Sequence, residues 1–412
     1  MIRTDFHSDT LLDLRPQVAA DSDRVPQGLA ARALRRVAGG LRCGALTVVT
    51  PDGTRMHHRA AAPGPEAELV LRRWRPLRRL ALAGDIGFAE SFLDGDWTSP
   101  DVAALLELAA RNAATLDGVM RGGLPMRLLQ RALHRLRPNT RRGSRRNVMA
   151  HYDLGNAFYA RWLDAGMSYS SALWPTPDMT LEQAQQAKQE RVLALLDPGP
   201  DSHVLEIGLG WGGQAECLAR AGCRVTGLTL SPAQHAHASA RLAGLPAEAH
   251  LRDYRDETGR YDGIVSIEML EAVGEAWWPT YFARLRDCLA PGGRAVLQVI
   301  TIDDGRFAQY RRTTDFIQRH VFPGGMLPSP AIVRAQAAAA GLRVTACERF
   351  GLDYARTLLI WRERFEAAWP EIAALGFDER FHRLWHYYLC YCEAGFRSGL
   401  LDVGLWRLEH AA

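Results

Sequence analysis

The segment VLEIGLGWGG, residues 204–213, places a strand-like apolar run directly before a glycine-rich turn. Glycines such as Gly208 and Gly210 let a backbone approach a ligand closely, and the helical pattern that follows would point its N-terminus at the same place. The spacing G-x-G-x-G-G differs from the G-x-G-x-x-G that is typical of dinucleotide-binding enzymes. Glu206 stands two residues before the first glycine, where a carboxylate can hold the amino group of S-adenosylmethionine. The segment therefore favours an S-adenosylmethionine site, and the alternative is a glycine turn that serves packing alone.

Four strand-like runs occur from about residue 187 onward, with helical patterns between several of them. They are SHVLEIG, CRVTGLTLS, YDGIVSIE and GRAVLQVITI, the last of which follows a PGG turn. Strands that alternate with helices are typical of an α/β protein with a doubly wound, mostly parallel sheet. Such sheets bind ligands at the carboxyl ends of their strands.

Two of these strand ends carry further candidate cofactor contacts. LTLSPAQ ends the second run, where a ribose contact is expected. The usual acid is missing there, so Thr229, Leu230 and Gln234 would have to serve. In LRDYRD, Asp253 could accept a hydrogen bond from an adenine amino group, and the alternative is a simple turn residue.

The chain has 412 residues, more than one hydrophobic core usually serves. Within residues 28–115, GALTVVTPDGTRMHH predicts a hairpin with PDG at its turn, and VAALLELAARNAATL predicts one amphipathic helix. We expect an irregular segment over residues 1–27, a smaller α+β N-terminal domain over 28–115, a basic connector over 116–147 and a catalytic domain over 148–412.

Residues 121–146 carry nine arginines and no acidic residue. The first half has apolar residues at near-helical spacing, and a basic amphipathic helix can lie on anionic lipid. A solvated linker is the alternative, and few aromatic residues interleave with the arginines as nucleic-acid binding would favour. We therefore expect contact with a membrane surface or a plain linker, and no nucleic-acid partner.

The location of the protein is predicted from what the chain lacks. No apolar run reaches the roughly 18–20 residues that span a bilayer, and the first residues carry charges where a signal peptide needs an apolar core. The seven cysteines are scattered without paired spacing, which fits a reducing compartment and argues against a metal site. We expect a cytoplasmic protein, peripheral on the inner membrane face.

Several segments, in this order along the chain, together resemble the cyclopropane-fatty-acyl-phospholipid synthase family, including its mycolic acid relatives. They are HYDLGNAFYARWLDAGMSYSSALW (151–174), VLEIGLGWGG, VTGLTLSPAQ, DYRD, IVSIEMLEAVG, FIQRHVFPGGMLPS (316–329) and FGLDYARTLLIWRERF (350–365). GDIGFAESFLDGDW (84–97) also looks like the accessory, lipid-binding-like domain of full-length members. The resemblance covers about residues 30–410. It implies a seven-stranded Rossmann-like methyltransferase sheet and an enzyme that uses S-adenosylmethionine on unsaturated phospholipid acyl chains at a membrane surface. A homodimer is left open.

The resemblance also implies roles for single residues. Tyr169 and Ser170 of MSYSS match cofactor contacts, as do Gly208, Gly210 and Gln234. His151 matches a family position as well, where it would orient its segment over the cofactor or serve packing.

A second set of matches concerns a bicarbonate ion, the presumed catalytic base of the family. Glu271, Ile300 and Tyr354 match positions that help to hold this ion. Ser171 and Gln298 stand where the family has Cys and His, and Ala272 stands where His commonly follows the glutamate. Ser and Gln still offer hydrogen bonds, so the resemblance implies an altered site at which bicarbonate binding is an open question.

The chemistry that the resemblance implies needs a base. An alkene attacks the sulfonium methyl and leaves a carbocation, and loss of a proton then closes a cyclopropane or leaves a methyl-branched alkene or a methylene group. In VSIEMLEAVGE (265–275), Glu268, Glu271 and Glu275 would share one face of a helix if a helix begins there. We expect Glu271 to be the base or to hold it, because a buried carboxylate has a raised pKa. Glu268 would face the cofactor or cap the helix.

Three functions stay in view from the sequence. The first is methyl or methylene transfer to phospholipid acyl chains, with a slight preference for the cyclopropane product and a methylated chain as the alternative. The second is a methyltransferase for a small natural product. The third is a lipid-binding protein without catalytic activity, against which the intact glycine loop speaks.

Overall fold

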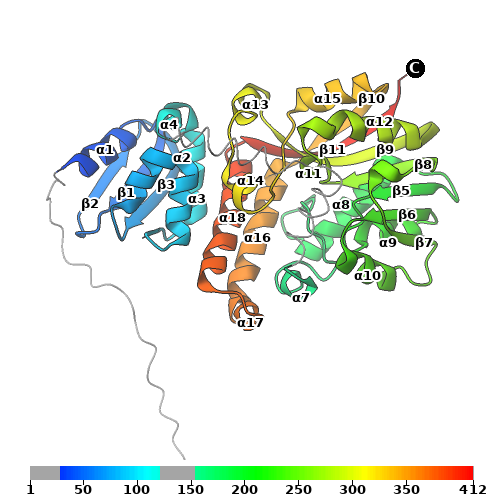
Figure 1. Ribbon diagram of the computed structural model, residues 1–412, viewed down its shortest axis with the longest axis horizontal. Coiled ribbons are helices and arrows are strands. Elements are labelled where there is room, and N and C mark those ends of the chain that lie inside the picture. The colour runs from blue at the N-terminus through cyan, green and yellow to red at the C-terminus, as the bar shows by residue number, and fades with distance from the viewer. Residues whose placement is uncertain (1–27, 121–153, 412) are drawn as a thin grey trace, which may run out of the picture.

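A computed structural model describes residues 28–120 and 154–411, which form two sheets with helices packed around and between them (Figure 1). We refer to residues 28–120 as the N-terminal unit. Its sheet has the strand order β2-β1-β3-β4. The strands and helices of this unit are β1 (Cys43–Val49), β2 (Arg55–Arg59), β3 (Ala62–Leu71), β4 (Trp97–Thr98), α1 (Leu29–Ala38), α2 (Arg75–Leu93), α3 (Val102–Arg111) and α4 (Ala113–Met120).

The predicted hairpin is confirmed, since β1 pairs with β2 in antiparallel register around the PDG turn. The single helix predicted over 102–116 is wrong, because α3 ends and α4 begins on either side of Asn112. The side chain of Asn112 accepts hydrogen bonds from the backbone of Arg42 and Cys43 and donates one to the carbonyl of Cys43. An asparagine that bonds to distant backbone competes with helical continuation. Because α4 runs to Met120, the domain boundary at residue 115 stays a prediction.

The larger sheet has seven strands in the order β10-β11-β9-β8-β5-β6-β7. β5 to β9 pair in parallel, and β11 runs antiparallel between β9 and β10. The predicted mostly parallel α/β sheet is therefore confirmed, and the four predicted strands correspond to β5, β6, β8 and β9. The seven strands are β5 (His203–Ile207), β6 (Arg224–Thr229), β7 (Ala247–Leu251), β8 (Tyr261–Ile267), β9 (Leu289–Ile302), β10 (Leu342–Arg349) and β11 (Leu401–His410).

Neighbouring residues of the central parallel strands enter different hydrophobic cores, as the two-residue period of a strand requires. Val204 packs in the core under α8, α9 and α10, and Leu205 packs under α11, α12 and α15 on the opposite face. The sheet is therefore doubly wound. The remaining helices are α7 (Asn156–Tyr159), α8 (Leu181–Leu196), α9 (Gly213–Arg220), α10 (Pro232–Arg241), α11 (Leu270–Val273), α12 (Trp278–Cys288), α13 (Asp304–Tyr310), α14 (Phe316–His320), α15 (Pro330–Ala339), α16 (Gly351–Ala367), α17 (Trp369–Ala374) and α18 (Glu379–Arg397), with 3₁₀ turns η1 (Tyr254–Asp256) and η2 (Glu275–Trp277).

Helices α16 and α18 lie side by side between the two sheets (Figure 1). α18 contains the aromatic-rich HYYLCYCEAGFR segment, and it packs on α3 and α2 of the N-terminal unit. Tyr387 of α18 contacts the rings of Phe92 and Trp97 in that unit. The hydrophobic core therefore runs without interruption from the N-terminal unit to α18.

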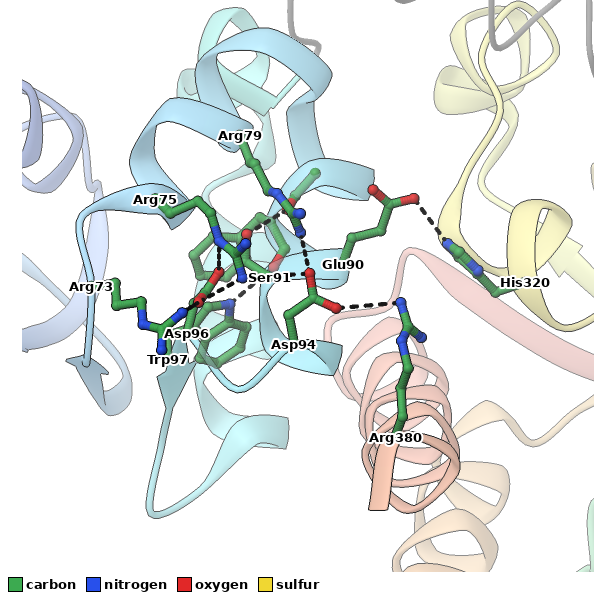
Figure 2. A network of polar contacts seen from close by, with 12 residues as sticks. Arg73, Arg75, Arg79, Glu90, Ser91, Asp94, Asp96, Trp97, His320 and Arg380 are labelled. Atoms are coloured by element: carbon green, nitrogen blue, oxygen red, sulfur yellow. Dashed lines mark hydrogen bonds and ion pairs between the residues drawn. The ribbon is translucent and has the colours of Figure 1, made fainter. Parts of the chain in front are cut away.

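A network of ion pairs adds to this contact (Figure 2). Asp96 has no exposed side-chain surface, and the guanidinium of Arg75 donates to both of its oxygens at 2.5 and 2.8 Å. Asp94 lies 3.4 Å from the guanidinium of Arg380 in α18. Figure 2 also shows Glu90 of α2 facing His320 of α14, at 3.5 Å. The pair of Asp96 lies within the N-terminal unit, whereas the contacts of Asp94 and Glu90 join this unit to α18 and α14.

Within the described ranges, no helix is long and apolar enough to cross a bilayer. The basic segment over residues 121–146 and His151 lie outside the described residues, so the predictions made for them stay predictions.

Candidate active site

A cavity of about 640 Å³ opens at the carboxyl ends of β5, β6 and β8 and extends to the N-terminal unit. Its volume lies in the range of roughly 300–1,000 Å³ that small-molecule sites occupy. Eleven of the residues predicted from the sequence line it together: Tyr169, Ser170, Glu206, Gly208, Gly210, Thr229, Leu230, Gln234, Glu271, Ile300 and Tyr354.

The glycine loop forms one wall of this cavity between β5 and β6. Gly208 has a φ of 89° and Gly210 a φ of 54°, both in the region that favours glycine. A Cβ on Gly208 would collide with the side chain of Met269, whereas the corresponding position on Gly210 faces open space. The backbone N–H groups of Gly208 and Leu209 donate to the carbonyl of Leu228. The loop therefore leaves a backbone-lined hollow on the side of Gly210.

Glu206 lies at the base of this hollow. Its side chain is buried, and Oε2 has no hydrogen-bond partner among the described residues. Burial raises the pKa of this carboxyl to about 8, against the opposing charges of Lys188 and Arg241. A buried, unpaired carboxyl oxygen costs free energy unless a donor meets it. The ammonium group of the methionine part of S-adenosylmethionine is such a donor, so the residues fit the cofactor.

Ser170 is held by two side chains of α8. Nζ of Lys188 donates to Oγ of Ser170 at 2.6 Å, and the side-chain amide of Gln185 donates to its carbonyl oxygen. Lys188 was not singled out from the sequence, although it is the one lysine of the chain and that singularity was an available signal. Burial lowers the pKa of its ammonium, while the charges of Glu268, Asp164 and Glu206 oppose that shift. Lys188 thus donates to Ser170 and lies close enough to Glu206 and Glu268 for their charges to affect it.

At the end of β6, the hydroxyl of Thr229 donates to Oε1 of Gln234 at 3.0 Å, and both side chains are buried at the cavity wall. Asp253 does not line the cavity. Its carboxylate accepts hydrogen bonds from the backbone N–H and the guanidinium of Arg255. The structure therefore brings Thr229 and Gln234 together and leaves Asp253 engaged by its own neighbour.

A cluster of hydrogen bonds forms around Glu268 at the cavity wall, and this part of the cavity is the candidate reaction centre. Oε1 of Glu268 accepts hydrogen bonds from the backbone N–H of Ser171 at 2.8 Å and from Nε2 of Gln298 at 2.7 Å. Oε2 accepts one from the hydroxyl of Tyr354, also at 2.8 Å. Three of the positions that the resemblance assigns to a bicarbonate shell thus converge on a carboxylate of the chain itself.

The backbone of Glu268 is in an unusual conformation for a glutamate, with a φ of 52° directly after β8. Non-glycine residues rarely adopt this region, and doing so costs about 1–3 kcal/mol unless the surroundings enforce it. Here the three donors and a backbone hydrogen bond to Gln298 fix the residue. Retained strain of this kind is typical of functional sites.

Glu271 lies next to Glu268 and also faces the cavity. Oε1 accepts a hydrogen bond from the backbone N–H of Ile300, and Oε2 has no partner among the described residues. Burial, followed by the charge of Glu268, raises the pKa of Glu271 to about 8. Burial also raises the pKa of Glu268, but hydrogen bonds from Ser171 and Tyr354 oppose that shift. Of the two carboxyls, Glu268 therefore has more hydrogen bonds that favour its charged form.

The expected helical face of three glutamates is wrong. Glu268 precedes the short helix α11, whose N-cap is Met269 without a side-chain hydrogen bond, so Glu268 does not cap it. Glu275 lies in η2 and pairs with Arg311 at 2.6 Å. The hydrogen bonds of Glu268 were not predicted from the sequence because its partners are distant in the chain, although a third acid in an apolar run was the available signal.

Aromatic side chains lie around Glu268 at the cavity wall. The hydroxyls of Tyr169 and Tyr388 share a hydrogen bond at 2.9 Å, and the ring of Tyr354 lies 4.6 Å from that of Phe396. Ala272 and Phe322 also line the wall. Within the described residues, no cluster of histidine, cysteine or acidic side chains could hold a metal ion.

Comparison with known proteins gives consistent matches. The mycolic acid cyclopropane synthetase family matches residues 139–406. The tuberculostearic acid methyltransferase of Mycobacterium tuberculosis is 40% identical over 95% of this chain and 97% of its own length. The cyclopropane-fatty-acyl-phospholipid synthase of Escherichia coli is 36% identical over 80% of this chain and 84% of its own. The solved structure of the cyclopropane synthase MmaA2 from Mycobacterium tuberculosis superposes with a TM-score of 0.61 at 31% identity, covering 64% of this chain and 97% of the other.

Proposed function

Because the chain belongs to the mycolic acid cyclopropane synthetase family, we propose that it transfers the methyl group of S-adenosylmethionine to the double bond of an unsaturated phospholipid acyl chain and yields a methylated chain rather than a ring. The observation that carries this proposal is the carboxylate of Glu268, which occupies the hydrogen bonds of Ser171, Gln298 and Tyr354. A carboxylate of the chain in that place would replace an external anion such as bicarbonate.

The chain's own residues would hold the cofactor at the glycine loop. Glu206 would receive the ammonium group, the open side of Gly210 would admit the ligand, and Thr229 with Gln234 would contact the ribose. When bound, S-adenosylmethionine supplies an electrophilic methyl group, which the alkene takes as the C–S bond breaks, leaving a cation on the neighbouring chain carbon.

Glu268 then acts as the base. Its carboxylate accepts one proton from carbon, and the C–H electron pair becomes a new C=C bond that quenches the cation. Loss of the proton from the carbon that received the methyl gives a methyl-branched alkene. Loss from the methyl after a 1,2-hydride shift gives a methylene group, and loss from the methyl without that shift closes a ring. Three donors fix the carboxylate, so it reaches only the protons that the bound chain presents to it.

The surrounding rings support this chemistry. The aromatic faces near Glu268 include those of Tyr169 and Tyr354, and an aromatic face can stabilise a cation by about 0.5–2 kcal/mol. The apolar wall of the cavity also keeps water from trapping the cation. Both properties suit an acyl chain more than a polar natural product, which would leave this apolar surface unfilled.

The comparisons support a lipid substrate through the names of the relatives, one of which is a tuberculostearic acid methyltransferase. A second candidate product is the cyclopropane, because another relative is named a cyclopropane-fatty-acyl-phospholipid synthase. A role at a membrane surface, the cytoplasmic location and a homodimer remain proposals of the sequence analysis. The lipid-binding protein without activity is disfavoured by the unpaired oxygen of Glu206, which a cofactor would satisfy.

The test is an analysis of the product. The protein is expressed in a host that makes unsaturated phospholipids and is supplied with methionine carrying a trideuterated methyl group. Labelled acyl chains are analysed by mass spectrometry before and after mild hydrogenation. We expect a product that takes up hydrogen, with three deuterium atoms for a methyl-branched alkene or two for a methylene group. A labelled product that resists hydrogenation and carries two deuterium atoms would be a cyclopropane and would overturn the proposal.

A further inference from the structure

A second group of polar side chains lines the same cavity, where it passes between the N-terminal unit and the larger sheet. Asp85 and Asp315 belong to it, together with Tyr387 and Tyr391 of α18. We call these four residues the junction site. None of them contributes to the donor shell of Glu268, so the proposed chemistry leaves them without a role.

The two aspartates come from different parts of the fold. Asp85 directly follows Gly84, whose φ of 66° breaks the path of α2, and Asp315 is the N-cap of α14. Their known hydrogen bonds are local, since Asp85 accepts from the backbone N–H of Ile86 and Asp315 from that of Gln318. Within residues 28–120 and 154–411, neither carboxylate pairs with a cation. Figure 2 shows how α2 and α14 approach each other through Glu90 and His320.

Such an arrangement is costly without a positive partner. Burial raises the pKa of Asp85 to about 7, and the charge of Asp315 adds to the shift. Burial likewise raises the pKa of Asp315 to about 6. Two carboxylates that face one cavity repel each other when charged, and a cation between them would remove that repulsion.

The tyrosines supply a second, independent indication of a ligand. Tyr387 is only 2% exposed, lines the cavity, and its hydroxyl has no hydrogen-bond partner among the described residues. Its ring is stacked with that of Tyr391, one turn along α18, with ring centroids 6.2 Å apart. Aromatic faces beside carboxylates are the usual surroundings of a bound ammonium group.

Positive side chains lie on the same cavity wall close by in the sequence. Arg306 and Arg312 line it, and neither forms an ion pair with a described residue. They belong to α13 and the turn after it, which lead directly to Asp315. A guanidinium is well suited to a phosphate. The wall therefore carries both anionic and cationic groups, a combination that is complementary to a zwitterion.

We propose that the junction site binds the ammonium group of a zwitterionic phospholipid headgroup, with Arg306 and Arg312 placed for its phosphate. This inference rests on the proposed function, because it assumes that the acyl chain of the same lipid reaches Glu268. It makes an amine-bearing phospholipid, such as a phosphatidylethanolamine, the preferred substrate class over an anionic one such as a phosphatidylglycerol.

The experiment measures binding to the whole chain loaded with S-adenosylhomocysteine. Dihexanoyl phosphatidylethanolamine, dihexanoyl phosphatidylglycerol and free phosphoethanolamine are titrated by calorimetry below the micelle concentrations of the two lipids. We expect the ethanolamine lipid to bind about tenfold more tightly than the glycerol lipid, as charged hydrogen bonds and cation–π contacts allow. Free phosphoethanolamine is expected to bind more weakly than the lipid. Equal affinity for the two lipids would overturn the proposal. Binding of free phosphoethanolamine as tight as that of the lipid would show that the ligand is the free headgroup compound and not a phospholipid.

Variants assign the effect to the residues. Asp85→Asn with Asp315→Asn keeps the local hydrogen-bond acceptors and the N-cap but removes both charges, so the ratio of the two lipid affinities should fall to about one. Asp378→Asn is the matched control, since Asp378 is an exposed N-cap of α18 away from the cavity, and its ratio should stay that of the wild type. If the double variant does not fold, Asp85→Asn alone and Tyr387→Phe should each lower the ratio. An unchanged ratio in folded variants would contradict the site.

Turnover separates this inference from the proposed function. Methyl transfer to both lipids with equal kcat/KM would contradict the headgroup preference of the junction site but would support the proposed function. Selective binding of the ethanolamine lipid without methyl transfer to any acyl chain would contradict the proposed function but would support the headgroup site.

Discussion

The hydroxyl of Tyr354 donates a hydrogen bond of 2.8 Å to the carboxylate of Glu268, across 86 positions of the chain. The amide of Gln298 and the backbone of Ser171 donate to the same carboxylate. A group that accepts three hydrogen bonds at the wall of an apolar cavity is held in one orientation, and these donors favour its charged form against the burial that raises its pKa. Both properties are required of a base that acts on a carbocation.

Glu268→Gln is therefore expected to lower kcat by about 10²–10⁴-fold, the usual contribution of a positioned base. The affinity for S-adenosylmethionine should stay close to that of the wild type, because the cofactor contacts lie at the glycine loop. Steady-state methyl transfer and a cofactor titration measure the two quantities. Glu275→Gln is the control, since Glu275 pairs with Arg311 outside the cavity. Turnover at the wild-type rate in Glu268→Gln would contradict the role of Glu268 as the base.

Glu271 gives a prediction for pH dependence. Its folded pKa of about 8 lies above the ordinary value of 4.5, so the folded state disfavours ionisation of this group. Stability is then fully present below about pH 4.5 and is lost as the pH rises toward 8, by an upper limit of about 5 kcal/mol at about 1.4 kcal/mol per pKa unit. Glu271→Gln removes the ionisation. Its melting temperature should exceed that of the wild type at pH 8–9 and match it near pH 4.5.

The same variant compares the two carboxylates as bases. From the sequence, Glu271 was expected to be the base, which predicts that Glu271→Gln abolishes turnover. If Glu268 is the base, Glu271→Gln should retain far more activity than Glu268→Gln at pH 7, since glutamine resembles the protonated acid. A greater loss in Glu271→Gln than in Glu268→Gln would return the role to Glu271.

Glu206→Gln tests the cofactor wall. Loss of a charge-assisted hydrogen bond to the ammonium of S-adenosylmethionine, worth roughly 1.5–3 kcal/mol, should weaken binding by about 10–100-fold. Calorimetry with S-adenosylhomocysteine, which carries the same ammonium group, measures this without turnover. Asp253→Asn is the comparison, because Asp253 is engaged by Arg255 and does not line the cavity. A larger effect of Asp253→Asn would place the adenine contact where the sequence first suggested it.

Asp96→Ala tests the internal stability of the N-terminal unit, to which both Asp96 and its partner Arg75 belong. Asp96 is fully buried and accepts two hydrogen bonds from Arg75, which remains partly exposed. Removing the carboxylate should lower the free energy of unfolding by about 1–3 kcal/mol. Glu68→Ala breaks an exposed pair with Arg55 and should cost less than about 1 kcal/mol. Urea denaturation measures both, and equal losses would show that the buried pair contributes no more than the exposed one.

Local patterns predicted much of the fold and of the cofactor wall. The glycine loop and four parallel strands are short segments whose spacing carries the information, and residues 204–213 lie where that spacing indicates. The break between α3 and α4 was not predicted, because Asn112 bonds to backbone about 70 positions away. The convergence of three donors on Glu268 was not predicted for the same reason. Its partners Ser171 and Tyr354 come from distant segments, and its positive φ has no sequence signature in a glutamate.

The central claim is that a carboxylate of the chain replaces an external anion, and the dependence of methyl transfer on bicarbonate tests it most directly. The rate is measured in buffer stripped of bicarbonate and after bicarbonate is added back. Glu268→Gly suits the positive φ and opens the donor shell of Ser171, Gln298 and Tyr354. We predict that the wild type is indifferent to bicarbonate and that Glu268→Gly is inactive without it and regains part of the rate with it. A wild-type rate that falls when bicarbonate is removed, with no rescue of the variant, would contradict the claim.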